Sequence, residues 1–202
     1  MSEPCVHIVD DDAPMRDSVA FLLGAEDMAT RTYDSARALL DRGAALEAGC
    51  IITDIRMPEM NGLEMVLELK RLGVPQPVIV LTGHADVSLA VQAMKAGVAD
   101  FLEKPFEHQA LLRAVRTALS QSGSEAGRQK EMAEIAARAG ELTAREREVF
   151  EAIVAGDSNK AAAIRLGISP RTVEIYRANV MTKMHANSLS ELVRMALQLE
   201  RR

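Results

Sequence analysis

In the stretch CIITDIRMP, residues 50–58, a short apolar segment is followed directly by an aspartate. An apolar run of this length is typical of a strand buried on both faces of a parallel sheet. A buried carboxylate is costly unless it is paired or bound to a cation. Asp54 therefore raises the question of which partner the rest of the chain supplies.

Residues 1–120 repeat one pattern, in which a short apolar run is followed by a segment with apolar residues three or four positions apart. Alternating strands and helices predict an α/β fold, here a doubly wound, flavodoxin-like parallel sheet of five strands in the order 2-1-3-4-5. The expected strands are 5–9, 29–33, 50–53, 77–81 and 99–102, and the expected helices are 13–25, 35–46, 62–72, 86–96 and 107–119.

The composition changes after residue 120. The polar, glycine-containing stretch QSGSEAG (121–127) marks a boundary, and helical spacing returns over 128–139. Capping boxes at TARE (143–146) and SLSE (188–191) predict helix starts. We expect a first domain over 1–120, a helical linker over 121–140 and an all-α domain of four short helices over 141–202.

Charge and composition narrow the classes of protein. Residues 1–120 carry a net charge of −7 and residues 141–202 one of +2, so the C-terminal part is the better candidate for nucleic-acid binding. No apolar run reaches the ~18–20 residues of a membrane helix, and no signal peptide is recognisable. We therefore expect a cytoplasmic protein without a membrane partner. Cys5 and Cys50 are expected to be buried thiols, and the four histidines show no metal-ligand spacing.

Polar residues follow four of the five expected strands. Asp10, Asp11 and Asp12 follow the first, Asp54 the third, Thr82 the fourth, and Lys104 the fifth. The carboxyl ends of parallel strands share one edge, and strands one and three are neighbours, so these carboxylates should converge.

Three close carboxylates need a counter-charge. An all-oxygen site selects a hard cation, Mg²⁺, with Mn²⁺ as a substitute. The metal would leave Asp54 as a nucleophile toward a phosphoryl group, whose oxygens Mg²⁺, Lys104 and Thr82 would neutralise. Taken singly, each residue has a structural interpretation, and Asp12 is expected to cap the helix that contains Pro14.

Four motifs, VHIVDDD (6–12), TDIRMPEMNG (53–62), VLTGH (80–84) and DFLEKPF (100–106), resemble the receiver domain of two-component response regulators over residues ~5–120. The resemblance implies that Asp54 is the phosphoacceptor and a sensor histidine kinase the donor. It also implies a Mg²⁺ site and three switch residues. The implied Mg²⁺ ligands are Asp10, Asp11, Asp54 and the carbonyl of Arg56; the phosphoryl-contacting and switch residues are Thr82, Lys104 and Phe101, with a cis bond before Pro105.

The segment GISPRTVEIYRANVMTKM (167–184) has a turn, a helix cap and a basic helix. On a helical wheel, Val173, Tyr176, Val180 and Met184 share a core face. The remaining face suits the major groove of DNA, with cations at its border for phosphates. The candidate DNA-binding residues are Arg171, Thr172, Glu174, Ile175, Arg177, Ala178, Thr182 and Lys183. The competing interpretation is an ordinary amphipathic helix with solvated charges.

Residues ~141–200 resemble the LuxR/FixJ-type (NarL-like) helix-turn-helix domain through LTAREREVF, SNK, ISPRTVE, RANVMTKM and SLSELVRMA. Ala162 departs from that pattern, where a larger apolar residue is usual. The resemblance to the FixJ branch implies a FixL-like kinase, promoter DNA and RNA polymerase as partners. It further implies that phosphorylation produces a homodimer through residues 86–102.

The resulting hypothesis is a phosphorylation-controlled transcription regulator with no enzyme activity beyond self-phosphorylation and slow self-dephosphorylation. One alternative is a Mg²⁺-dependent aspartyl phosphatase fused to an accessory domain. That enzyme would need an acid at the position of Arg56, whose guanidinium does not donate a proton in this way. A second alternative is a protein-interaction adaptor, for which DNA binding would be absent or insensitive to salt.

Overall fold

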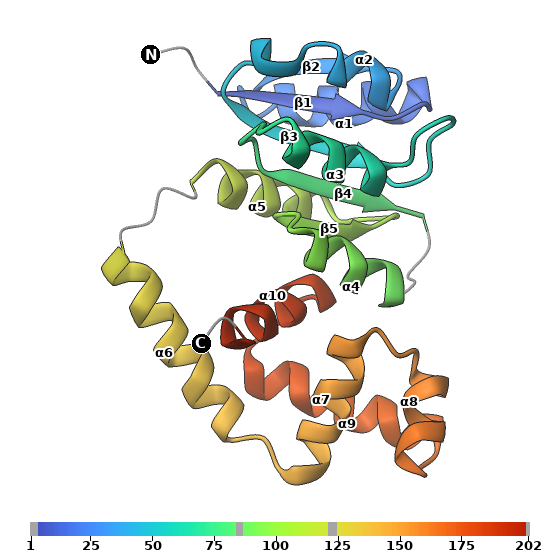
Figure 1. Cartoon of the computed structure of the whole chain (residues 1–202), viewed down its shortest axis with the longest axis vertical. Helices are drawn as coiled ribbons and strands as arrows, with labels where there is room; N and C mark the ends of the chain where they lie inside the picture. Colours follow the sequence, from blue (N-terminus) through green and yellow to red (C-terminus); the bar gives the residue numbers. More distant parts are fainter. Residues whose placement is uncertain (1–3, 84–86, 121–124, 201–202) are drawn as a thin grey trace. The chain divides into compact units, whose positions relative to one another are not determined.

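The computed structural model describes residues 4–83, 87–120 and 125–200. Five strands form one parallel sheet in the order β2-β1-β3-β4-β5, which confirms the expected fold and strand order (Figure 1). The strands are β1 Cys5–Val9, β2 Ala29–Tyr33, β3 Gly49–Asp54, β4 Val78–Thr82 and β5 Asp100–Glu103.

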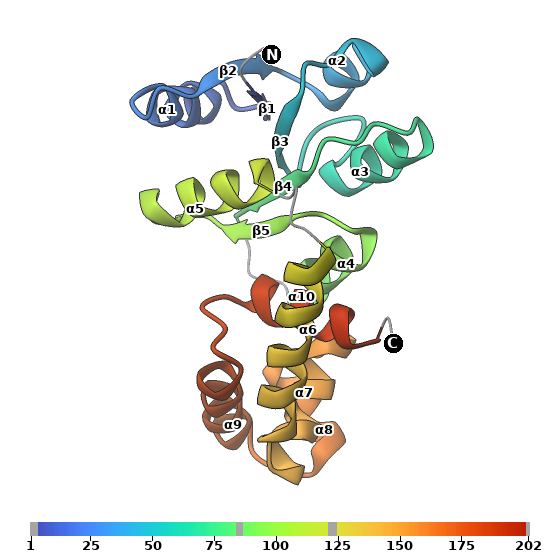
Figure 2. The same ribbon diagram turned by 90° about the vertical axis from the view of Figure 1, so that its left-hand side faces the viewer.

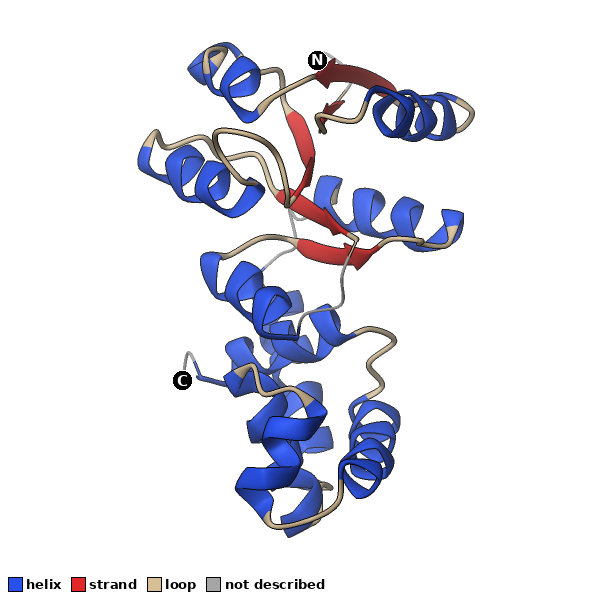
Figure 3. Cartoon of the chain, turned by 90° about the vertical axis from the view of Figure 1, so that its right-hand side faces the viewer, coloured by secondary structure: helices blue, strands red, loops and turns tan. Residues whose placement is uncertain are grey.

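Helices cover both faces of this sheet. Figure 2 shows α1 and α5 on one face and α2 and α3 on the other, and Figure 3 shows helices on both sides of the strands from the opposite direction. The helix α2 is shorter than expected, because it ends at Leu40 and a 3₁₀ turn, Gly43–Ala45, follows with Gly43 in the left-handed region. The helices of this part of the chain are α1 Ala13–Gly24, α2 Ala36–Leu40, α3 Gly62–Arg71, α4 Val87–Ala96 and α5 His108–Leu119.

The core between the sheet and the α1/α5 layer is built from alternate strand residues, because successive side chains of a strand point to opposite faces. Val6 and Ile8 of β1 pack here with Cys50 and Ile52 of β3. Cys5 and His7 of β1 therefore face the α2/α3 side. Cys5 and Cys50 are free, buried thiols, as the sequence predicted.

Local sequence sets the helix starts near the carboxyl edge of the sheet. Asp12 caps α1 by accepting the Met15 N–H, as expected, and Pro14 occupies the first turn. Asn61 and Glu64 form a capping box at α3. Gly62 begins α3 so close to the third strand that an added Cβ would lie 2.3 Å from the Asp54 carbonyl oxygen. Only glycine lets this backbone approach the end of β3.

We predict that Gly62→Ala destabilises the first domain by roughly 1–3 kcal/mol, because the new methyl group would press on a backbone atom that has no room to retreat. The measurement is the urea midpoint of the full chain. Gly24→Ala is the control, since nothing lies within 4 Å of a Cβ at that position. Equal midpoints for the two variants would contradict the prediction.

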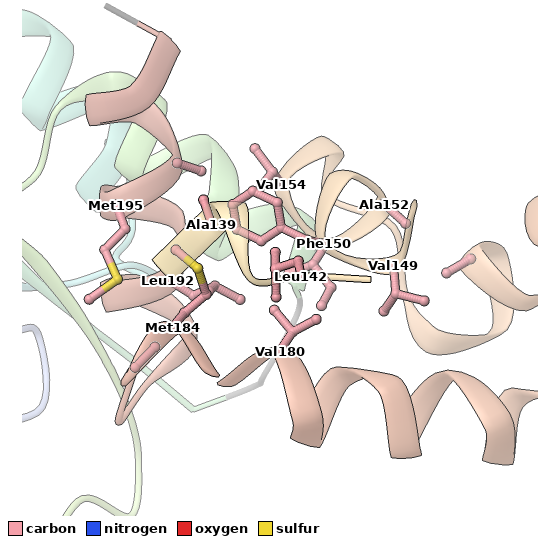
Figure 4. Packing of buried hydrophobic residues seen from close by; sticks show 14 of the residues in the cluster. Ala139, Leu142, Val149, Phe150, Ala152, Val154, Val180, Met184, Leu192 and Met195 are labelled. Atoms are coloured by element: carbon pink, nitrogen blue, oxygen red, sulfur yellow. The ribbon is translucent and has the colours of Figure 1, made fainter. Parts of the chain in front are cut away.

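The C-terminal part is all α-helical and ends in the expected group of four helices. Its core is a single apolar cluster that includes Val149, Phe150, Val180, Met184 and Leu192 (Figure 4). The helices are α6 Glu125–Gly140, α7 Ala144–Ala155, α8 Asn159–Leu166, α9 Pro170–Met184 and α10 Leu189–Glu200. Ala162, the departure from the family pattern, is buried in this cluster.

By their contacts, the described residues divide into two compact units, 4–83 with 96–120 and 87–95 with 125–200. All of α4 except its last residue thus groups with the second unit, although α4 connects β4 to β5 in the chain. Within the described ranges, no helix has the length and apolar character needed to span a membrane. The expected boundary at 121–127 lies partly outside the described residues.

Candidate functional site

Strand register brings the polar strand ends together. Val9 of β1 pairs with Thr53 of β3, so Asp10 and Asp54 follow side by side. On the other flank, Asp54 pairs with Leu81 of β4. The next pair, between β4 and β5, sets Thr82 beside Glu103, so Lys104 emerges at the same edge.

Lys104 joins the two buried carboxylates. Its Nζ lies 2.6 Å from Asp54 Oδ1 and 2.9 Å from Asp10 Oδ2. The relative exposure of Asp10 is 3% and that of Asp54 is 8%. Burial lowers the pKa of Lys104, but its hydrogen bonds to Asp54 and Asp10 outweigh burial, and the net pKa is raised. The lysine is therefore charged, and its positive charge partly compensates the negative charge of the buried Asp54 carboxylate.

The remaining carboxylate oxygens are held by backbone N–H groups. Asp54 Oδ2 accepts the N–H of Arg56 at 2.6 Å. Asp10 Oδ1 accepts the N–H of Asp12 at 2.9 Å, and the Arg16 guanidinium donates to the Asp10 carbonyl at 2.6 Å. These bonds orient both acids before any ligand arrives, which reduces the reorganisation that binding would need.

The other predicted site residues differ in burial: Thr82 and Phe101 are buried, whereas Asp11 is exposed. Thr82 is buried at the same edge, where its carbonyl accepts the Lys104 N–H at 2.6 Å, and Phe101 is buried in β5. The Lys104–Pro105 bond is cis, as expected. Asp11 is exposed, and its carboxylate does not form a group with those of Asp10 and Asp54 in which all ligand oxygens lie within 4.8 Å. The structure therefore gathers two of the three predicted acids around Lys104.

The second candidate site is the solvent face of α9. Arg171, Glu174, Ile175, Ala178 and Thr182 are all exposed, and Ile175 is 57% exposed although it is apolar. Among the residues that the structure describes, the side chain of Arg171 has neither an ion pair nor a hydrogen-bond partner. The face is therefore open to a partner, as the helical wheel predicts.

The helix-turn-helix geometry around α9 is fixed by its caps. Ser169 caps α9 through the Thr172 N–H, and Thr172 Oγ1 lies 2.8 Å from Ser169 Oγ. Gly167 ends α8 in the left-handed region, where glycine is favoured. Arg177 at the border of the face donates to Asn159 Oδ1 at 3.3 Å, so it is tied to the start of α8.

Family profiles match both parts of the chain. The response regulator receiver domain matches residues 6–116, and the luxR family of bacterial regulatory proteins matches residues 140–196. The chain is 54% identical to the transcriptional regulatory protein FixJ of Azorhizobium caulinodans, over 95% of this chain and 91% of that protein. It is 48% identical to FixJ of Bradyrhizobium diazoefficiens, over 96% and 94% of the two chains.

The chain belongs to the FixJ-like response regulators. Among solved structures, it matches full-length FixJ from B. japonicum with a TM-score of 0.58 and 46% identity, over 100% of both chains. The isolated FixJ-N structure matches 61% of this chain and 99% of its own length, with a TM-score of 0.58 and 43% identity. A receiver implies a histidine kinase partner, and a luxR-type domain implies DNA binding. Together they favour a transcription regulator over the phosphatase and adaptor alternatives.

In this FixJ-like regulator, Lys183 at the border of the exposed face of α9 also forms an ion pair inside the C-terminal domain. Its Nζ lies 2.7 Å from Glu146 Oε2, and Glu146 is buried. The same oxygen accepts the N–H and hydroxyl of Thr143 in the α7 capping box. The hydrogen bond of Lys183 and those of Thr143 lower the pKa of Glu146 to about 2. The sequence identified Glu146 only as a cap, because its partner lies 37 positions away.

We predict that the C-terminal domain loses stability as the pH falls from about 4.5 toward 2, because the folded state holds Glu146 ionised while the unfolded state takes up a proton. Glu146→Gln should lower the thermal midpoint at pH 7 and flatten this acid dependence. Circular dichroism melts at several pH values measure both. Glu148→Gln is the control, since the ion pair of Glu148 with Arg145 is exposed at the surface. An acid dependence unchanged in Glu146→Gln would refute the assignment.

Proposed function

We propose that a FixL-like sensor histidine kinase phosphorylates this regulator on Asp54 and that phosphorylation increases its affinity for promoter DNA. The observation that supports this most directly is the Lys104 ammonium within hydrogen-bonding distance of both Asp10 and Asp54. A lysine in that position can neutralise an oxygen of a phosphoryl group attached to Asp54.

In the proposed step, a carboxylate oxygen of Asp54 attacks phosphorus. The bond between phosphorus and the kinase histidine nitrogen breaks as the bond to the Asp54 oxygen forms, and the histidine keeps the electron pair. Lys104 moves its hydrogen bond from Asp54 Oδ1 to a phosphoryl oxygen. The Thr82 hydroxyl is a candidate to bind another.

Mg²⁺, or Mn²⁺ in its place, fits the donor set. Mg²⁺ is bound by one or two carboxylates and keeps several waters, and Asp10 and Asp54 supply such a pair. Asp11 and the Arg56 carbonyl remain proposed ligands. When bound, the ion would supply positive charge to the phosphoryl oxygens. The residues of this chain hold the acceptor oxygen in position and complete the neutralisation.

The same acceptor chemistry extends to small phosphoryl donors. Asp54 should react with acetyl phosphate without a kinase, since positioning and charge neutralisation are properties of the receiver itself. The acyl phosphate should then hydrolyse slowly, because Arg56 stands where a phosphatase would need a proton donor. Self-phosphorylation and slow self-dephosphorylation are thus the only catalysis we propose.

Phosphorylation adds charge at a buried edge and biases a two-state receiver. Following the family pattern, Thr82 is drawn to the phosphoryl group, Phe101 turns inward, and the surface over 86–102 pairs two receivers. A homodimer places two α9 helices on a promoter with two half-sites, where effective concentration raises affinity. RNA polymerase is the proposed downstream partner, and promoter binding implies action in the cytoplasm.

The test compares promoter-fragment binding and oligomeric state before and after treatment with acetyl phosphate and Mg²⁺. We expect tighter binding, dimer formation on size exclusion and an affinity that falls with salt. Arg171→Glu is the control, because it reverses an unpaired charge on the exposed face while leaving the phosphoacceptor site intact. It should still dimerise but bind DNA weakly. Unchanged affinity and oligomeric state after confirmed phosphorylation would reject the proposal.

A further inference from the structure

A second cluster of reactive side chains lies at the opposite end of the sheet from Asp54. Cys5 and His7 are the first and third residues of β1 and therefore project from the same face. Glu47 comes from the segment just before β3. One ligand atom of each residue, the thiol sulfur, a ring nitrogen and a carboxylate oxygen, lies within 4.8 Å of the other two.

The two carboxylate oxygens of Glu47 differ in their contacts. Oε1 forms an ion pair with Arg31 at 2.6 Å. Oε2 is buried and has no hydrogen-bond partner within the part of the chain that the structure describes. A buried polar atom without a partner carries a desolvation cost that is normally offset by a bound group. The Glu47 Oε2 atom thus points to a missing ligand.

The histidine is oriented for such a ligand. His7 is fully buried, with Nε2 lying 3.2 Å from the Glu47 carbonyl oxygen and Nδ1 lying 3.2 Å from the Tyr33 hydroxyl. A carbonyl oxygen only accepts, so Nε2 donates to the Glu47 carbonyl, and Nδ1 is the ring nitrogen that can offer a lone pair. A bond from one ring nitrogen to a backbone carbonyl is the common outer contact of a metal-binding histidine.

We propose that Cys5, His7 and Glu47 form a binding site for a zinc ion, with a water molecule or the Tyr33 hydroxyl as the fourth ligand. A thiolate, an imidazole and a carboxylate are the ligand types of zinc, whereas Mg²⁺ prefers an all-oxygen set. The site is separate from the phosphoacceptor, because the length of β1, roughly 16 Å, lies between them.

Zinc binding requires the Cys5 thiol to lose its proton. On binding, the sulfur–hydrogen bond breaks, the proton goes to solvent, and the sulfur electron pair forms the bond to zinc. One Zn²⁺ then compensates the thiolate and the Glu47 carboxylate, and the half-exposed Arg31 guanidinium that pairs with Glu47 leaves one net positive charge at the site.

Zinc in this position would connect distant parts of the chain. Glu47 and His7 are 40 residues apart, and the site would tie the first strand to the segment that leads into the third. Because metal binds only when these parts are folded, zinc is expected to stabilise the receiver. The inference does not depend on phosphorylation.

The experiment titrates the reduced, metal-free full-length protein with Co²⁺, a spectroscopic substitute for zinc, and then displaces it with Zn²⁺. The wild type should show a cobalt–thiolate charge-transfer band that Zn²⁺ abolishes, and Zn²⁺ should raise its thermal midpoint. Cys5→Ser should remove the band. Cys50→Ser, on the other face of the sheet, and Asp54→Asn should keep it.

Glu47→Gln provides a second variant if Cys5→Ser does not fold, since Glu47 is partly exposed and glutamine keeps its size. It should weaken zinc binding by at least ~10-fold, because even outer-contact changes have effects of that order. The absence of a thiolate band in the wild type would overturn the proposal. A band that survives in folded Cys5→Ser, or zinc binding unaffected by Glu47→Gln, would do the same.

Discussion

Asp54→Asn is expected to reduce labelling by acetyl phosphate to background and to hold DNA affinity at its unphosphorylated level. The amide nitrogen and carbonyl oxygen of asparagine do not form a stable acyl phosphate, whereas a carboxylate oxygen does. The variant should still fold. An asparagine carbonyl can accept the hydrogen bond that Lys104 Nζ makes to Asp54 Oδ1 at 2.6 Å. Phosphate-affinity electrophoresis and promoter-binding titrations measure the two effects.

Asp17→Asn is the matched control. Asp17 is an exposed acid on α1 of the same domain, so its variant carries the same change in net charge without touching the carboxyl edge. It should label and respond like the wild type. Residual labelling of Asp54→Asn at the wild-type level would mean that another residue accepts the phosphoryl group, and the proposed site would be wrong.

Lys104→Met is expected to destabilise the receiver by about 3 kcal/mol, because removing one partner of a buried ion pair leaves uncompensated charge. Here two carboxylates lose one shared cation, and the side chains of Asp10 and Asp54 are only 5% and 11% exposed. Adding Mg²⁺ should recover part of the loss, since the bound ion can take over the charge compensation that the lysine supplied to Asp10 and Asp54. Urea unfolding with and without Mg²⁺ measures both effects.

Phosphorylation of Lys104→Met should also be slower, because one phosphoryl oxygen loses its counter-charge. Lys70→Met serves as the control, since Lys70 is exposed on α3 and its loss should change neither stability nor labelling. A Lys104→Met midpoint equal to that of Lys70→Met would show that Asp10 and Asp54 do not depend on the lysine for compensation.

The predictable part of the site follows from topology. Once the apolar runs are assigned to parallel strands, the order β2-β1-β3-β4-β5 places the residues after β1, β3, β4 and β5 at one edge. That is why Asp10, Asp54 and Lys104 could be brought together on sequence grounds. The less predictable part is side-chain choice: Asp11 follows the same strand as Asp10, yet it turns to solvent while Asp10 is buried.

In the helix-turn-helix, too, the sequence predicts which residues face the core but not which side chains pair. The 3.6-residue period separates the buried residues of α9, such as Val173 and Val180, from the exposed Arg171 and Ile175. Periodicity does not reveal which cation at the border of that face already has a partner. Lys183 reaches back to Glu146 at the start of α7, and only the packing of α7 against α9 brings them together.

The sequence by itself predicted the parallel sheet and the helical C-terminal part, and it led to the proposals that Asp54 is the acceptor and that the exposed face of α9 binds DNA, because each depends on local periodicity or on which residue ends a strand. Tertiary structure alone decided which side chains meet. Glu47 approaches Cys5 and His7 only after β1 pairs with β3, so no spacing in the chain could predict that cluster. Contacts between residues far apart in sequence depend on register and packing, which appear only when the chain is folded.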